Sequence, residues 1–270
     1  MRLPISADPA ISHTETRSTR RKTVSGISVL VAFWLLPTVS PAASPLEIWP
    51  AEGPPTAPLV RQMEAIDAAA AGLPQALQPA VRFQKLFLKI LSGAKPGEWR
   101  GEMEAFCNPP AGAPLAAGMC EVARVWIARA QMDEIDAALR GYYRRNIRFP
   151  ATLAELGAPL PKDPWGEDWS YTPLAPQGFS KLADQRYQLG PARFPKLAPL
   201  AESLRGRKPQ AHAWSITPRE VAGKTALEFR AGQTLAVIQP GGVVEGCTLL
   251  FIGEQWALLA GRDGLFAVAF

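Results

Sequence analysis

Apolar positions between Pro114 and Arg145 recur at the spacing of one helix face. Steps of three and four positions connect a single series of residues: Val125, Ala128, Met132, Ile135, Leu139 and Tyr142. Residues three and four apart lie on the same side of an α-helix, and proline suits the first helical position. We therefore predict a long helix from about Pro114 to Arg145, with this face buried.

Shorter helical patterns precede this helix. Residues 59–92 contain apolar positions at helical spacing in two pieces, which Pro74 and Pro79 separate. A third short helix is expected over 98–106. Residues 44–58 are rich in proline and show no periodicity, so we expect an irregular lead-in there.

A short helix and a tight turn follow the long helix. Thr152 and Glu155 have the spacing of a capping box, which predicts one or two helical turns that end at Gly157. The sequence Asp163-Pro164-Trp165-Gly166 predicts a type I turn, because Asp accepts a backbone N–H and Pro presets φ. Trp165 is then expected to pack back on the long helix.

Two strands are expected after this turn. Trp169 and Tyr171 alternate, so they share one face of a strand, and residues 186–189 can form its partner. The long helix would then lie across a small antiparallel sheet.

From Thr225 onward, short apolar runs alternate with glycine-containing turns. The expected strands are Leu227–Arg230, Thr234–Gln239, Cys247–Ile252, Trp256–Ala260 and Leu265–Phe270. This pattern indicates a small barrel or sandwich, which is marginal in isolation. We expect it to lean on the rest of the chain or on a partner.

The predicted fold class is α+β, with a helical region, a long helix on a small sheet, and an all-β C-terminal module. The expected segments are a targeting segment at 1–42, a proline-rich lead-in and helical region at 43–113, a head at 114–190, a linker at 191–222 and a β module at 223–270.

The N-terminus has the features of an export signal. Arg20-Arg21-Lys22 precede an apolar run from Val24 to Leu36, and small residues surround Ala42. This order is typical of a cleaved signal peptide; the alternative is an uncleaved anchor with its basic end in the cytoplasm. The expected location is the periplasm, with inner-membrane association in the second case.

The basic character of the chain comes largely from this segment. Residues 1–42 hold five basic and two acidic residues, so they supply +3 of the net charge of +5 and leave +2. No clustered basic face is evident in the remainder, so nucleic acid is not an expected partner. Apolar residues make up 47% of the chain, which is enough for a buried core.

Three cysteines occur, of which Cys107 and Cys120 flank a turn rich in proline and glycine. These two are candidates for a disulfide, since helices that fold back would bring them together; the alternative is three buried thiols, Cys247 included. Only His212 follows residue 42 and no Cys-x-x-Cys spacing occurs, so we expect no metal site and no cofactor.

Catalytic patterns are weak. Asp133, Glu134 and Asp136 have no His or Cys motif beside them and indicate a solvated helix face, and Ser215 lacks a Gly-x-Ser-x-Gly context. His212 is expected to face solvent. Exposed rings could bind carbohydrate, although core packing also explains the candidates Trp165, Trp169 and Trp214. We therefore predict no enzyme and no small-molecule substrate.

Residues 115–190 resemble the head domain of the major pseudopilin of type II secretion systems. The residues that carry the resemblance follow the family's order and spacing: Tyr142, Asn146, Phe149-Pro150, Leu160 to Gly166 with Asp163, Pro164 and Trp165, and then Trp169-Ser170-Tyr171. The resemblance implies a helix packed on a sheet, and these residues as its fold-defining motif.

Two departures from that family stand out. The prepilin leader, with its Gly and its Glu five residues into an apolar helix, is absent, so filament assembly of the usual kind is not expected. The family's calcium loop is replaced by residues 190–195, which hold no carboxylate. Since a calcium ion takes several oxygen ligands, we predict no calcium site.

The C-terminal module resembles the periplasmic homology domain of type II secretion clamp proteins and pilus-assembly lipoproteins. Gly232 to Leu235, Leu249 to Ile252, Ala257 to Leu259 and Gly261 fit its outline. Together the resemblances imply a non-enzymatic envelope component whose partners are other secretion or pilus apparatus proteins. The alternative is a periplasmic binding protein, for carbohydrate or another ligand, that reuses the head.

Overall fold

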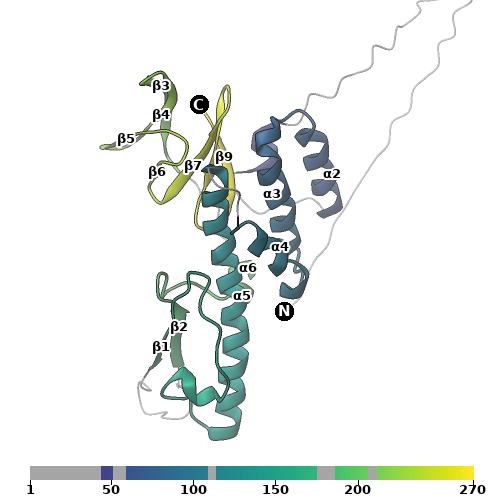
Figure 1. The fold of residues 1–270 in the computed structure, drawn as a ribbon, viewed down its shortest axis with the longest axis vertical. Coiled ribbons are helices and arrows are strands. Elements are labelled where there is room, and N and C mark those ends of the chain that lie inside the picture. Colours follow the sequence, from purple (N-terminus) through teal and green to yellow (C-terminus); the bar gives the residue numbers. More distant parts are fainter. Residues whose placement is uncertain (1–43, 51–58, 109–113, 175–185, 206–211) are drawn as a thin grey trace, which may run out of the picture. The chain divides into compact units, whose positions relative to one another are not determined.

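The computed structural model describes residues 44–50, 59–108, 114–174, 186–205 and 212–270 (Figure 1). The predicted targeting segment at 1–42 lies outside these ranges. Residues from Pro41 to Phe270 form one compact unit by their contacts. That unit combines helices with small antiparallel sheets, so the predicted α+β class is confirmed.

Short helices build the region before the long helix. They are α1 (Pro45–Ile48), α2 (Leu59–Ala70), α3 (Gln78–Leu91) and α4 (Arg100–Ala105), with 3₁₀ turns at Gln75–Leu77 and Pro96–Glu98. The prediction of two helices followed by a short third is confirmed. Pro79, however, lies in the first turn of α3 rather than outside it, where its missing N–H costs nothing.

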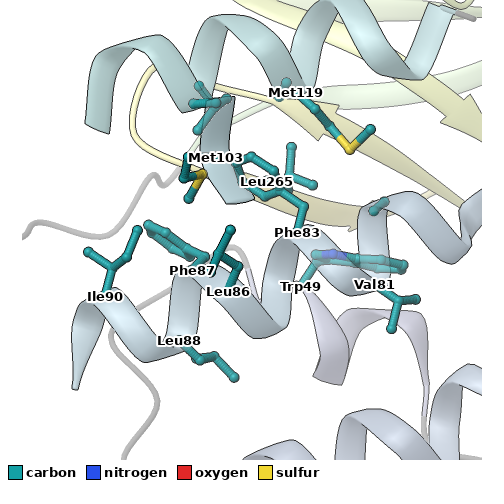
Figure 2. Packing of buried hydrophobic residues seen from close by; sticks show 14 of the residues in the cluster. Trp49, Val81, Phe83, Leu86, Phe87, Leu88, Ile90, Met103, Met119 and Leu265 are labelled. Atoms are coloured by element: carbon teal, nitrogen blue, oxygen red, sulfur yellow. The ribbon is translucent and has the colours of Figure 1, made fainter. Parts of the chain in front are cut away.

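The core of this region forms between α3 and the first half of α5 (Pro114–Asn146). Figure 2 shows Phe83 and Phe87 of α3 beside Met119 of α5 and Leu265 of the β module. Phe87 meets Trp126 of α5 edge to face, with ring centroids 5.2 Å apart. Segments distant in the sequence therefore share a single hydrophobic core.

The lead-in contributes to this core, which its sequence did not predict. Trp49 directly follows α1 and is fully buried. Its ring stacks with Trp256 at 6.1 Å between centroids, and its carbonyl accepts a 2.8 Å hydrogen bond from the N–H of Ala267. The end of α1 thus covers one edge of the C-terminal sheet.

The long helix α5 matches its prediction, Pro114 to about Arg145. The predicted face is buried in a second cluster with the residues after the helix: Val125, Ala128, Met132, Ile135 and Leu139. Tyr142 at the end of the series is half-buried. The opposite side of the first half carries Met119, Val122 and Trp126 into the core of Figure 2. The helix therefore packs on two sides.

The segment after α5 forms the predicted small sheet. A 3₁₀ turn at Leu153–Leu156 ends at Gly157, whose φ of 80° is the left-handed conformation that glycine adopts at helix ends. Strand β1 (Trp169–Leu174) pairs antiparallel with β2 (Arg186–Pro191), with Tyr171 opposite Leu189. We call residues 114–191 the head segment.

The C-terminal module contains two antiparallel sheets. One is β3 (Ser215–Val221), β4 (Lys224–Ala231) and β5 (Thr234–Ile238); the other is β6 (Val243–Val244), β7 (Cys247–Ile252), β8 (Trp256–Ala260) and β9 (Leu265–Ala269). A shared cluster joins them, with Phe229 from the first sheet and Leu249, Leu259 and Phe266 from the second.

Strand β3 lies in the range that the sequence assigned to a linker. It escaped prediction because Pro218 interrupts it and most of its side chains are exposed. The same range also holds a short helix, α6 (Leu200–Arg205). The module leans on the rest of the chain, as expected: a Cβ at Gly118 of α5 would collide with the side chain of Leu250 of β7.

Candidate functional site

The signature residues of the head segment are engaged with one another. The hydroxyl of Tyr142 donates to Glu155 Oε2 at 2.9 Å, while Oε1 accepts the N–H groups of Ala151 (2.7 Å) and Thr152 (3.1 Å). The hydrogen bond from Tyr142 is the main reason that the pKa of Glu155 lies below its usual value. Asn146 donates to the carbonyl of Tyr142 at 3.0 Å and caps the end of α5.

Asp163 organises the predicted turn. Its Oδ1 accepts the N–H groups of Trp165 and Glu167, both at 2.9 Å, and its carbonyl accepts the N–H of Gly166 at 2.9 Å. The φ of Gly166 is 87°, which favours glycine at that position. Pro164 presets the first corner, so the whole motif is explained by turn formation.

The aromatic residues of the signature are packed inside the head segment. The indole N–H of Trp169 donates to the carbonyl oxygen of Pro161 at 2.9 Å. The hydroxyl of Tyr171 donates to the carbonyl oxygen of Pro150, also at 2.9 Å. Trp165 packs back on α5, as predicted, and donates to Glu121 at 3.1 Å. Phe149 meets the ring of Tyr187 edge to face at 4.7 Å.

The candidate tryptophans do not form an open carbohydrate-binding face. Trp169 is buried, and Trp165 meets Phe194 edge to face at 5.4 Å. Trp214 stacks on His212 with 3.9 Å between ring centroids. Rings engaged in this way have little free surface for stacking on a sugar.

The candidate disulfide between Cys107 and Cys120 is not formed; both are free thiols, as is Cys247. The two nevertheless lie together, with Cys107 Sγ 3.5 Å from the carbonyl oxygen of Cys120. Burial and the neighbouring Cys120 raise the pKa of Cys107 to about 12. The sequence placed the pair correctly, but spacing alone did not decide whether the bond exists.

A cleft of about 670 Å³ lies between the head segment and the C-terminal module. One wall is α5 at Glu121 and Val125, together with Arg193 and Phe194 after β2. The other wall is the β6–β7 hairpin and the turn between β8 and β9. His212 also lines the cleft.

Charges of both signs line this cleft. Arg193 lies 3.4 Å from Glu121, and Arg262 lies 3.3 Å from Asp263. These guanidinium groups are largely exposed, so each keeps donors that can reach a bound molecule. The exposed Val243 adds an apolar position at the rim.

A cysteine, a histidine and a glutamate meet on the cleft wall. Cys247 Sγ lies 3.7 Å from His212 Nε2, and Glu245 Oε2 lies 3.8 Å from His212 Nδ1. Glu245 also accepts the indole N–H of Trp214 at 2.9 Å. The expectation that His212 faces solvent is wrong: its side chain is 18% exposed and stacks against the rings of Trp214 and Phe266.

The electrostatics of Cys247 oppose a nucleophilic role. Burial, with a smaller contribution from Glu245, raises its pKa to about 11. The reactive form of cysteine is the thiolate, and this thiol is overwhelmingly protonated at neutral pH. Within the described ranges, no group of three His, Cys, Asp or Glu side chains could hold a metal ion.

A smaller cavity of about 100 Å³ lies among α1, α2 and α3. Gln84 lines it, is 4% exposed, and has no hydrogen-bond partner for Oε1 in the part of the chain that the structure describes. A cavity of this size accommodates a few water molecules, which would satisfy that oxygen. Hydration is the simplest account of this cavity.

Comparisons with known proteins gave no match: no family model matches the chain, and no curated protein or solved structure matches it either. The described part of the chain also contains no helix that is both long and apolar enough to cross a membrane.

Sequence reasoning missed the cleft for a physical reason. Its walls come from segments more than a hundred residues apart, and His212 meets Cys247 across 35 positions. No local spacing encodes such a meeting. The one available signal was the single histidine after residue 42, which stands close to the start of the C-terminal strands.

Proposed function

We propose that this protein is a non-enzymatic component of a type II secretion or pilus-like apparatus of the cell envelope, and that it binds other proteins of that apparatus. The observation that carries the proposal is the closure of the segment from Tyr142 to Tyr171 onto α5. Its hydrogen bonds and ring contacts are internal, as a pseudopilin-like head requires.

The side chains of the segment from Tyr142 to Tyr171 contact one another inside the head segment. We therefore expect a partner to bind another surface. The cleft beside Arg193 and Arg262 is the best candidate, since it is large, concave and lined by both charges and apolar groups. Mixed charges favour orientation and specificity in protein contacts. The exposed Val243 supplies an apolar anchor at the rim.

A crosslinking experiment tests this proposal. A photoreactive amino acid in place of Val243 should capture a secretion or pilus component in the cells that make the protein. The matched control is the same substitution at Val60, an exposed valine on α2 outside the cleft. Capture of apparatus proteins at Val243 alone supports the proposal, and capture of none at either position overturns it.

Ligand binding is the second candidate, and the cleft volume favours it. About 670 Å³ falls within the range of small-molecule sites. The guanidinium groups of Arg193 and Arg262 would suit a ligand that carries a carboxylate or phosphate. This reading keeps the protein in the periplasm as a binding protein that reuses the head.

Calorimetric titration separates the two candidates. The purified chain would be titrated with simple anionic metabolites and sugars, beside an Arg262→Gln variant. Saturable heat that the variant loses favours ligand binding. Its absence, together with crosslinks at Val243, favours the apparatus component.

A further inference from the structure

Among the described residues, the sheet formed by β3, β4 and β5 has no further strand at either edge, and the two edges differ in chemistry. Strand β3 carries Pro218 in its middle, followed by Arg219 and Glu220. Proline removes a backbone donor and charges oppose pairing, so this edge is protected against addition of a strand. Strand β5 (Thr234–Ile238) contains neither a proline nor a charge.

The outward side chains of β5 are apolar. Leu235 is 56% exposed and Val237 is 46% exposed, whereas Ala236 and Ile238 pack against the core of the module. Alternation along the strand therefore places two large apolar side chains on the solvent side of an open edge. An edge of this composition is a template for pairing with another strand.

The backbone of β5 has N–H and C=O groups that could pair with another strand. Ala231 lies opposite Thr234 across the hairpin turn, and Phe229 lies opposite Ala236. Hydrogen-bonded pairs alternate with non-bonded pairs in an antiparallel ladder. If Ala231 and Thr234 close the turn as a bonded pair, the N–H and C=O groups of Leu235 and Val237 point away from β4.

We propose that β5 pairs antiparallel with β5 of a second copy of this chain, about a two-fold axis through Ala236. In this register Leu235 of each copy lies opposite Val237 of the other. These residues then exchange backbone hydrogen bonds on both sides of the axis. The small side chain of Ala236 lets the strands approach at the axis, where the pair is not hydrogen-bonded.

The charges on β4 are compatible with a second copy as the occupant, because Arg230 and Glu228 already pair within each copy at 3.2 Å. On β4, Arg230 lies beside Leu235 and Glu228 lies beside Val237. Each row across the joined sheets therefore runs from Arg230 of one copy to Glu228 of the other, so like charges do not face each other. A closed two-fold contact also uses the same patch on both copies, which is the commonest symmetry of oligomers.

The contact is small, so the dimer should be weak. One short strand and its apolar neighbours bury less surface than the roughly 1,200–2,000 Å² of stable interfaces. We therefore expect the dissociation constant of the dimer to lie in the micromolar range.

Sedimentation velocity of the full chain tests the proposal. Between about 1 and about 200 µM the wild type should pass from monomer to dimer, a range set by the expected micromolar affinity. Val237→Lys should raise the dissociation constant about tenfold or more, because a charge enters the paired edge. Val221→Lys, at an exposed valine on the protected β3 edge, should leave it unchanged.

A charge-pair rescue tests the register itself. Leu235→Lys and Val237→Glu should each weaken the dimer, whereas the double variant should recover it, because the new ammonium group at position 235 then faces the new carboxylate at position 237 of the other copy. Circular dichroism should show that all variants stay folded, since both positions are exposed. A wild type that remains monomeric throughout the range overturns the proposal, as does a double variant weaker than both single ones.

Discussion

A guanidinium nitrogen of Arg129 lies 2.5 Å from a carboxylate oxygen of Asp263 and joins the middle of α5 to the turn between β8 and β9. The arginine side chain is 5% exposed and the aspartate 28%. Arg129 also donates to the carbonyl of Ala198 at 2.7 Å and to the hydroxyl of Ser203. One side chain therefore ties the long helix, α6 and the C-terminal module together.

The two partners of this pair should not be equivalent. Asp263→Ala leaves a buried cation without its counter-charge, and breaking a buried pair in this way costs about 3–5 kcal/mol. Arg129→Met keeps the volume and leaves Asp263 beside Arg262, so it should cost less. Urea unfolding measures both.

The matched control is Arg262→Met. Arg262 is exposed and pairs with the same aspartate, so its loss should cost less than about 1 kcal/mol. Equal costs for Asp263→Ala and Arg129→Met would contradict the asymmetry.

The sequence predicted what local spacing determines. The buried face of α5 followed from steps of three and four, and the Asp163 turn followed from the chemistry of Asp, Pro and Gly. Arg129 gave no such signal, because its partner lies 134 positions away and nothing around it marks a buried charge. Its role exists only once the module has folded against the helix.

The same limit explains the other omissions. Trp49 belongs to a segment too short to show a helical or strand periodicity of apolar residues. It is nevertheless fully buried, because Trp256 and β9 pack against it. Strand β3 has exposed side chains and a central proline, so its pattern is that of a loop. Tertiary contacts decided both.

Gly190 should tolerate no side chain. A Cβ there would lie 2.7 Å from the carbonyl oxygen and 2.9 Å from the Cα of Pro195, and backbone atoms cannot move aside as a flexible side chain can. Gly190→Ala should therefore cost about 1–3 kcal/mol of unfolding free energy, as overpacking does. Chemical denaturation provides the measurement.

Gly101 of α4 supplies the matched control, since no described residue has an atom within 4 Å of the position that its Cβ would take. Gly101→Ala should stabilise by about 0.5–1 kcal/mol through helix propensity. A destabilisation of similar size at both positions would show that the contact with Pro195 is not the cause.

The buried thiol of Cys247 should make stability fall at alkaline pH. Its pKa rises from 9.0 to about 11 on folding, so the folded state holds the proton more tightly than the unfolded chain. The contribution to stability is therefore complete below pH 9 and is lost as the pH rises from 9 to 11. The expected slope is about 1.4 kcal/mol per pH unit from this group.

Cys247→Ala isolates that contribution from the other groups that titrate in the same range. The variant loses packing at every pH. Between pH 9 and 11, however, its unfolding free energy should fall less steeply than that of the wild type, by about 1.4 kcal/mol per pH unit, because one titrating group is missing. Urea unfolding at several pH values gives both slopes. Parallel curves for the two proteins would disprove the assignment.

Cys107 and Cys120 should form a disulfide when the chain refolds with oxidised glutathione. The two thiols lose their protons and electrons as the bond forms, and glutathione disulfide is reduced to two thiols. Cys107 Sγ lies 3.5 Å from the Cys120 carbonyl, so the two residues are already neighbours in the fold. Its pKa of about 12 keeps the folded thiol protonated, so oxidation should be efficient during refolding and slow in the native protein.

Closing this short loop should add about 3 kcal/mol to stability. Peptide mapping by mass spectrometry should locate the bond between these two cysteines and leave Cys247 free, and the urea midpoint should rise. Cys107→Ser is the control and should show no gain on oxidation. A bond that involves Cys247 instead, or an oxidised protein no more stable than the reduced one, would contradict the pairing that α4 and α5 present.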